Sequence, residues 1–137
     1  MSNQNQNETD FDPASLIRVE TIEEIVALPP ETEGVFVTRL TDDKLQAITV
    51  RVPRLRHLIT DGSTQVTDAG LACLSRLNNL QRLDLEWSGV TDAGLPSIAA
   101  VRTLRWVDLG FCDGVTPQGL AELRRVRPDL EIVDAAV

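Results

Sequence analysis

The sequence predicts an α/β fold made of short repeated units, with a parallel β-sheet on one face and helices on the other. The hexapeptide Val-Thr-Asp-Ala-Gly-Leu occurs at Val66–Leu71 and again at Val90–Leu95, 24 residues further along the chain. Weaker copies begin at Leu40 and at Val115. A fixed period of this length is typical of stacked supersecondary units, each of which packs mainly against its neighbours.

The spacing of apolar residues changes within each unit, and this change predicts one helix followed by one short strand. Leu71, Leu74 and Leu77 are three residues apart, as on one face of a helix. Leu83 and Leu85 are two residues apart, as on one face of a strand. The same places are taken in the third unit by Leu95, Ile98, Val101, Leu104, Val107 and Leu109. In the fourth unit they are taken by Leu120, Leu123, Val126, Leu130, Val133 and Ala135.

Threonines mark where the helices are expected to begin, because a threonine hydroxyl accepts a hydrogen bond from a free amide of the first turn. These residues are Thr41, Thr67, Thr91 and Thr116. Aspartates follow the first three, and arginines lie near the predicted helix ends, as the helix dipole favours. In the fourth unit Pro117 follows instead, and proline is favoured at the first helical position.

Two stretches, Leu80–Leu95 and Leu104–Leu120, carry a resemblance to a known family. The first reads Leu-Gln-Arg-Leu-Asp-Leu-Glu-Trp-Ser-Gly and continues into the hexapeptide. The pattern, over residues 40–137, resembles leucine-rich repeats of the cysteine-containing kind found in F-box-type adaptors, with Cys112 at the turn position of that subtype. The resemblance implies a short leucine-rich-repeat solenoid like that of ribonuclease inhibitor, with its sheet on the concave face and its helices on the convex face.

The chain divides into a tail, a capping segment and four repeats. We expect a disordered polar and acidic tail at 1–12 and a degenerate repeat at 13–39 that caps the first full unit. Within the cap, Thr21 and Glu24 have the spacing of a capping box, followed by a strand near 35–38. The four repeats are expected at 40–65, 66–89, 90–114 and 115–137.

Composition and charge exclude several classes of function. Residues 1–34 carry eight acids against Arg18, whereas residues 35–137 carry 13 acids and 12 bases, so no basic face is expected for nucleic acid. No stretch approaches the roughly 18 apolar residues of a membrane span, which favours a cytoplasmic protein. Cys73 and Cys112 lack the spacing of a metal site or a disulfide framework, and no cofactor is expected.

Alternation along each predicted strand places the non-repeating residues on the concave face, in columns that run across the repeats. The first column holds His57, Arg82, Trp106 and Ile132; the second holds Ile59, Asp84, Asp108 and Asp134; the third holds Asp61, Glu86, Gly110 and Ala136. Trp87 and Phe111 follow the third column at the rim of the sheet. The predicted partner-binding residues are Arg82, Asp84, Glu86, Trp87, Trp106, Asp108, Phe111, Ile132 and Asp134.

Each of these features also has a purely structural interpretation. The stacked aspartates either dock a basic partner or are balanced by arginines, water and turn amides; they lack the ligand spacing of a calcium loop. Arg82 is placed to lie over the ring of Trp106, a cation–π arrangement. Trp87 and Phe111 either contact a partner or pack on each other and seal the core.

The predicted function is non-enzymatic binding of a protein partner, for which a basic partner is one candidate. The chain has one histidine, no tyrosine and no glycine-rich phosphate loop after a strand, so no catalytic site is expected. A second hypothesis is homodimerisation or assembly through the last predicted strand, Glu131–Ala135, which no capping element follows. A third is a substrate-recognition adaptor or an effector, by analogy with the family alone.

Overall fold

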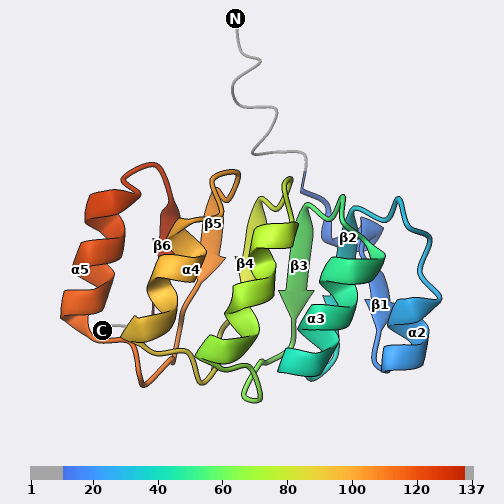
Figure 1. Cartoon of the computed structure of the whole chain (residues 1–137), viewed down its shortest axis with the longest axis horizontal. Helices are drawn as coiled ribbons and strands as arrows, with labels where there is room; N and C mark the ends of the chain where they lie inside the picture. The colour runs from blue at the N-terminus through green and yellow to red at the C-terminus, as the bar shows by residue number, and fades with distance from the viewer. Residues whose placement is uncertain (1–10, 135–137) are drawn as a thin grey trace, which may run out of the picture.

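The computed structural model describes residues 11–134, and its centre is a sheet of six parallel strands in chain order. The predicted α/β solenoid of parallel strands and packed helices is confirmed. The strands are β1 (Ile17–Val19), β2 (Gly34–Val37), β3 (His57–Thr60), β4 (Arg82–Asp84), β5 (Trp106–Asp108) and β6 (Glu131–Val133). Figure 1 shows them side by side behind a row of helices.

The helices that follow β1 form one layer on one face of this sheet (Figure 1). The other face has no such layer in the described residues, and Phe11, two residues before Pro13, packs there on His57 and Arg82. We call the uncovered side the open face; it corresponds to the predicted concave face. The helical elements are η1 (Pro13–Ser15), α2 (Ile22–Val26), α3 (Asp42–Arg51), η2 (Asp68–Arg76), η3 (Asp92–Gly94), α4 (Leu95–Ala99) and α5 (Pro117–Val126).

The helix of the second repeat is a 3-10 helix, which departs from the α-helix that the sequence led us to expect. Its buried residues Leu71 and Leu74 lie three apart, which matches the three residues per turn of a 3-10 helix. In α3, by contrast, the buried positions include Leu45, Ile48 and Thr49, a spacing of three and four that suits an α-helix.

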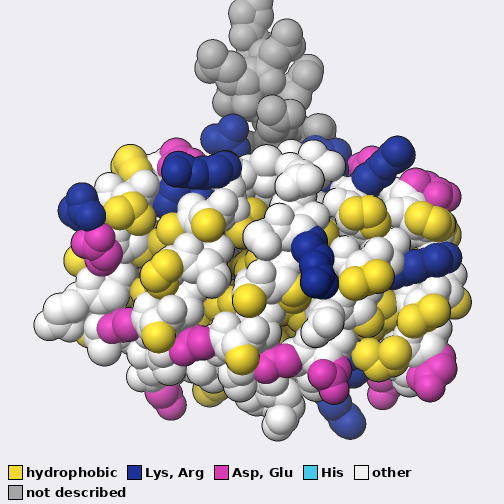
Figure 2. Space-filling view, viewed as in Figure 1, with side chains coloured by type: hydrophobic (Ala, Val, Ile, Leu, Met, Phe, Trp, Pro, Cys, Tyr) yellow, Lys and Arg dark blue, Asp and Glu magenta, His cyan; other side chains and the backbone are white. Residues whose placement is uncertain are grey.

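The predicted starts of the helices are confirmed at most of the threonines. Thr41 and Thr116 accept hydrogen bonds from the third amide of their helices, at 3.1 and 3.0 Å. Thr91 caps the amide of Ala93, whereas Thr67 makes no side-chain cap. The capping box at Thr21 is present in full. Figure 2 shows the charge pattern that goes with these starts, with acidic side chains in a row along the lower edge of the helix layer.

The aspartates of the hexapeptide have a further role: each one bonds the threonine that opens the next repeat. The backbone N–H of Thr91 donates to Asp68 Oδ1 at 2.8 Å, and the Thr91 hydroxyl donates to Asp68 Oδ2. The same pair of bonds joins Asp42 to Thr67 and Asp92 to Thr116, with N···O distances of 2.9 Å in both. We call each such pair of bonds a latch.

The glycine of the hexapeptide is explained by the same latch. A Cβ on Gly94 would collide with the Asp68 carboxylate, and the same collision would occur between Gly70 and Asp42 and between Gly119 and Asp92. The first repeat receives no such latch and has Lys44 at the glycine position. The fourth repeat has Pro117 at the aspartate position and offers no carboxylate to a further repeat.

The fourth repeat corrects part of the predicted alignment. The sheet pairs Val107 with Ile132 and Asp108 with Val133, so β6 is shifted by one residue from the expected register. A shift of one residue moves every side chain to the other face of a strand. Val126, expected in the core, is 42% exposed, and Arg127 is the buried residue at the end of α5 instead, at 3%.

The predicted tail also needs a correction at its end. Asp12 caps η1 by accepting the Ala14 N–H at 3.0 Å, and Phe11 packs against the sheet, so these two residues form part of the folded structure. The predicted disorder of residues 1–10 lies outside the described residues.

Candidate functional site

An arginine held between two aromatic rings lies at the centre of the open face. The guanidinium of Arg82 is 5.1 Å from the ring centroid of Trp106, as expected, and 4.5 Å from that of Phe11. Phe11 also meets His57 edge to face at 4.8 Å, and His57 is buried. The register explains the cluster, because it places His57, Arg82 and Trp106 side by side on β3, β4 and β5.

Phe11 is the member of this cluster that sequence reasoning missed. It stands in a polar and acidic stretch that has no repeat pattern, so the register of the repeats could not place it. The available signal was the presence of one aromatic residue in that stretch. Arg18, over the ring of Phe36 at 4.4 Å, shows that the same kind of contact continues to the first strands.

Three acidic side chains gather beside this cluster: Asp84, Glu86 and Asp108, with oxygens that all lie within 4.8 Å of one another. We call them the acidic trio. Asp84 accepts the backbone N–H of Glu86 at 3.0 Å, and Asp108 accepts that of Gly110 at 2.8 Å. The predicted stack of Asp84 and Asp108 is therefore present, and turn amides partly balance it. Within residues 11–134, this is the group whose side chains could share a cation.

Burial disfavours the ionised form of two members of the acidic trio, Asp84 and Glu86. Burial raises the pKa of Asp84 to about 6. The hydrogen bond from the Glu86 amide opposes this increase, and the charge of Asp108 adds to it. Burial, followed by the charge of Asp108, also raises the pKa of Glu86. Among the salt bridges of the described residues, none involves these three carboxylates. The trio thus presents acidity that turn amides balance in part and that no salt bridge of the described residues neutralises.

Trp87 and Phe111 form a second aromatic feature at the end of the strands. Their rings are stacked, with centroids 4.2 Å apart and an angle of 8° between planes. They are 50% and 48% exposed, so they pack on each other as one of our two interpretations expected, but much of each side chain still contacts solvent. We call them the aromatic pair.

The backbone of the aromatic pair is left-handed, with φ of 68° at Trp87 and 58° at Phe111. Arg39, at the matching turn position of β2, has φ of 55°, and Gly62 takes that position after β3 with φ of 154°. A bulky residue with positive φ is uncommon, because its Cβ approaches the neighbouring carbonyl. The positive φ at this position favours glycine or asparagine. The two aromatic residues therefore adopt a backbone conformation that is unfavourable for their residue types.

Two predicted site residues do not lie on the open face. Ile132 pairs with Val107 and packs against the core. Asp134 accepts a salt bridge from Arg124 at 2.7 Å, toward α5, and does not continue the aspartate column. Glu131 is the residue that pairs with Trp106, and it is exposed. The sequence did not indicate this shift, because Val133 and Ala135 fit the apolar spacing of the repeats as well as Ile132 does.

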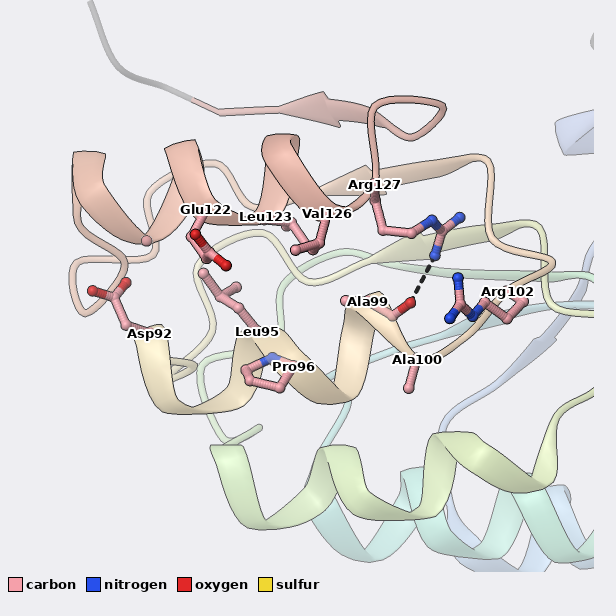
Figure 3. A pocket seen from close by; sticks show the side chains of 11 residues that line it. Asp92, Leu95, Pro96, Ala99, Ala100, Arg102, Glu122, Leu123, Val126 and Arg127 are labelled. Carbon is pink, nitrogen blue, oxygen red and sulfur yellow. Dashed lines mark hydrogen bonds between the residues drawn. The ribbon is translucent and has the colours of Figure 1, made fainter.

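The helix layer carries a separate groove of about 490 Å³ between α4 and α5 (Figure 3). Its apolar lining includes Leu95, Pro96, Ala99, Leu123 and Val126. Arg127 closes one end, where its guanidinium donates to the carbonyl oxygens of Ala99, Val101 and Leu104 and pairs with Asp129. This groove lies on the side of the molecule opposite to the predicted binding residues.

The repeat pattern matches one known family. The model of the family described as Leucine Rich repeat matches residues 76–99, a stretch that contains β4 and the turn that follows it. The fold is a leucine-rich-repeat solenoid. The match and the parallel sheet support a leucine-rich-repeat protein, whereas the F-box-adaptor subtype stays a prediction. No curated protein matches the chain.

Leucine-rich-repeat solenoids are generally interaction folds, so the comparison suggests a protein-binding module. The part of the chain that the structure describes has no helix that is both long and apolar enough to cross a membrane. A cytoplasmic location and the absence of a cofactor stay predictions.

Proposed function

We propose that this leucine-rich-repeat solenoid is a non-enzymatic module that binds a protein partner through its open face. The observation that carries the proposal is the aromatic pair, which exposes about half of two large rings in a strained backbone conformation. Strained residues cluster at ligand-binding positions, and tryptophan is enriched among the residues that dominate binding energy at interfaces.

The surroundings of the aromatic pair also fit an interface. The acidic trio, the Arg82 cluster and the aromatic pair lie on neighbouring strands, so a partner could contact all three at once. Strands β4 and β5 and the turns that follow them position these groups before a partner binds, which lowers the entropy lost on binding. The charge of the trio, which no salt bridge of the described residues neutralises, favours a partner whose matching surface is basic.

The same surface is poorly suited to chemistry. His57 lies under Phe11 and is buried, so its imidazole does not face a bound molecule. Among the described residues, no nucleophilic side chain is hydrogen-bonded to the carboxylates of the trio, and a catalytic pair needs a base and a nucleophile within hydrogen-bond reach. We therefore propose binding by surface complementarity without a reaction.

The proposal is tested by a pulldown from native host extract with the full chain and with Trp106→Ala/Asp108→Arg. The double variant removes one ring of the Arg82 cluster and reverses one charge of the trio, and both changes lie on the open face. We expect at least one partner that the full chain retains and the double variant loses. An unchanged set of partners would show that the open face is not the binding surface.

A second candidate function is assembly through β6. This strand is the last of the sheet in the described residues and has β5 on one side only. Unpaired backbone groups on an edge strand favour pairing with another chain. If two copies pair there, sedimentation should give twice the monomer mass, and Ile132→Pro should restore the monomer. A monomer at tens of micromolar concentration would exclude this candidate.

A further inference from the structure

We propose that the outer ring face of Trp87, above Gly62, is a docking slot for an arginine side chain of the partner protein. This inference rests on the proposed function and adds to it the chemistry of the residue that binds. Arg39, Gly62, Trp87 and Phe111 occupy the same position in the turns that follow β2, β3, β4 and β5, and we call them the turn column. The inference depends on the sizes of the side chains at these four positions.

One face of the Trp87 ring is covered and the other is open. Phe111, from the next repeat, stacks on the covered face at 4.2 Å. On the other side the column continues with Gly62, which has no side chain, and a Cβ added there would meet no atom within 4 Å. Adjacent parallel strands are about 4.8 Å apart, so the position above Gly62 has room for one planar group stacked on the ring.

The charges around this slot determine the kind of group that fits. Asp61 directly precedes Gly62 and is the acidic residue beside the opening, whereas the Glu86 carboxylate lies on the β5 side, toward Gly110 and Asp108. Asp61 is exposed and uses one oxygen to accept the Arg39 N–H at 3.0 Å. A cation that stacks on Trp87 above Gly62 would therefore have the second carboxylate oxygen of Asp61 as its acidic neighbour.

Arginine satisfies these requirements better than lysine does. Its guanidinium is planar, less strongly hydrated than an ammonium group, and able to stack on a ring while its N–H groups bond a carboxylate. The chain itself provides a precedent on the same face, where Arg82 lies between the rings of Phe11 and Trp106. The slot above Gly62 offers a partner's arginine one open ring, that of Trp87, and one carboxylate, that of Asp61.

The inference is tested by selecting binders from a random peptide library displayed on phage. The full chain, Trp87→Asn and Val126→Asn are immobilised and panned in parallel. Asparagine tolerates the left-handed backbone at position 87, so the fold is kept, as circular dichroism would verify. Val126→Asn is the matched control, because Val126 is an exposed apolar residue on the helix side of the molecule.

We expect arginine to be enriched at one fixed position among peptides selected by the full chain and by the Val126→Asn variant, and not among those selected by Trp87→Asn. Enrichment that survives Trp87→Asn, enrichment of lysine or apolar residues instead, or a library that returns no binder would overturn the inference.

The selected peptide is then synthesised with its arginine replaced by lysine or by citrulline, and binding is followed through the indole N–H signal of Trp87 by NMR. Lysine should weaken binding about fivefold and citrulline about tenfold, since one loses the planar contact and the other loses the charge. Equal binding of the arginine and lysine peptides would exclude a guanidinium slot.

Comparison with the pulldown distinguishes failure of this inference from failure of the proposed function. A native partner that is lost with Trp106→Ala/Asp108→Arg but kept with Trp87→Asn would mean that the open face binds protein without the slot. A partner set that neither variant changes would refute both.

Discussion

Asp68, in the first turn of helix η2, and Asp84, on the sheet, have the same side chain in opposite surroundings. Both carboxylate oxygens of Asp68 accept hydrogen bonds from Thr91, which links the second repeat to the third. Asp84 is buried, accepts the Glu86 amide at 3.0 Å and lies beside two further acids. The turn aspartate has its charge balanced by donors, whereas burial near like charge raises the pKa of the sheet aspartate to about 6.

This difference separates the residues that stabilise the stack of repeats from those that are available to bind a partner. The residues that recur from repeat to repeat form the latches, and their polar atoms are satisfied within the molecule. The open face and its rim instead hold groups that are unfavourable in the isolated protein: the buried Asp84 beside further acids, and the aromatic pair with its positive φ. We infer that a bound partner stabilises these groups, because residues that lower the stability of the free protein commonly occur at functional sites.

The largest effect is expected from Asp68→Ala, which removes a latch. Loss of two hydrogen bonds to a charged group should lower the free energy of unfolding by about 3 kcal/mol. Urea denaturation followed by circular dichroism measures the change. Asp43→Ala is the control, because Asp43 lies in the first turn of α3 but makes no latch, and it should change the free energy of unfolding by less than about 0.5 kcal/mol. Equal effects of the two substitutions would show that the latch does not stabilise the stack.

A smaller loss is expected from Gly94→Ala, and it should depend on Asp68. The added Cβ would collide with the Asp68 carboxylate and approach Leu71 Cδ1 at 3.0 Å, so the variant should lose about 2 kcal/mol of stability. In the Asp68→Ala background the collision with the carboxylate is removed. The cost of Gly94→Ala should then fall by at least half, which a double-mutant cycle measures. Strict additivity would contradict the assigned role of this glycine.

The hexapeptide shows how far the sequence could predict the fold. Its period and the apolar spacing were sufficient for the parallel sheet and the order of the elements, because they depend only on residues that recur. The latch was not predicted, since Asp68 and Thr91 are 23 residues apart and each already had a local role at a helix start. Contacts between repeats depend on how the units stack, and that geometry is not visible in one unit.

The candidate site was predictable where the strands keep the repeat register. Arg82 and Trp106 face each other as the period indicates, as do Asp84 and Asp108. The predicted positions of Ile132 and Asp134 on the open face were wrong, because β6 pairs with β5 one residue earlier than the repeat alignment indicated. Both alignments place apolar residues in the core, so the sequence could not distinguish between them. The left-handed conformation of Trp87 is a property of the turn, and no local sequence preference favours it there.

On the sheet side of the comparison, Asp84→Asn should stabilise the protein. The amide oxygen can still accept the Glu86 N–H, and the buried charge is gone. Because the pKa of Asp84 is raised from 3.8 to about 6 on folding, the folded state binds the proton more tightly. The contribution of Asp84 to stability is therefore present below about pH 4 and lost as the pH rises through 6.

At pH 8 the Asp84→Asn variant should accordingly exceed the parent by about 2 kcal/mol in free energy of unfolding, and near pH 4 the gain should disappear. Urea denaturation across this pH range measures both values. Asp61→Asn, at an exposed carboxylate that also accepts a backbone amide, is the matched control and should change the free energy of unfolding by less than about 0.5 kcal/mol. A variant that is less stable than the parent at pH 8 would mean that the sheet aspartate stabilises the fold, as the turn aspartate does.

The smallest effects separate the backbone strain of the turn column from the stacking of its rings. Arg39→Gly relieves a positive φ at an exposed residue, so the free energy of unfolding should rise by about 0.5–1 kcal/mol. Trp87→Gly relieves the same strain but loses the stack on Phe111, which contributes about 0.5–1.5 kcal/mol, so its gain should be smaller or absent. Chemical denaturation of both variants gives the stacking contribution as the difference. Equal gains would mean that the rings do not stabilise each other, and that only a partner could then account for two aromatic residues in these turns.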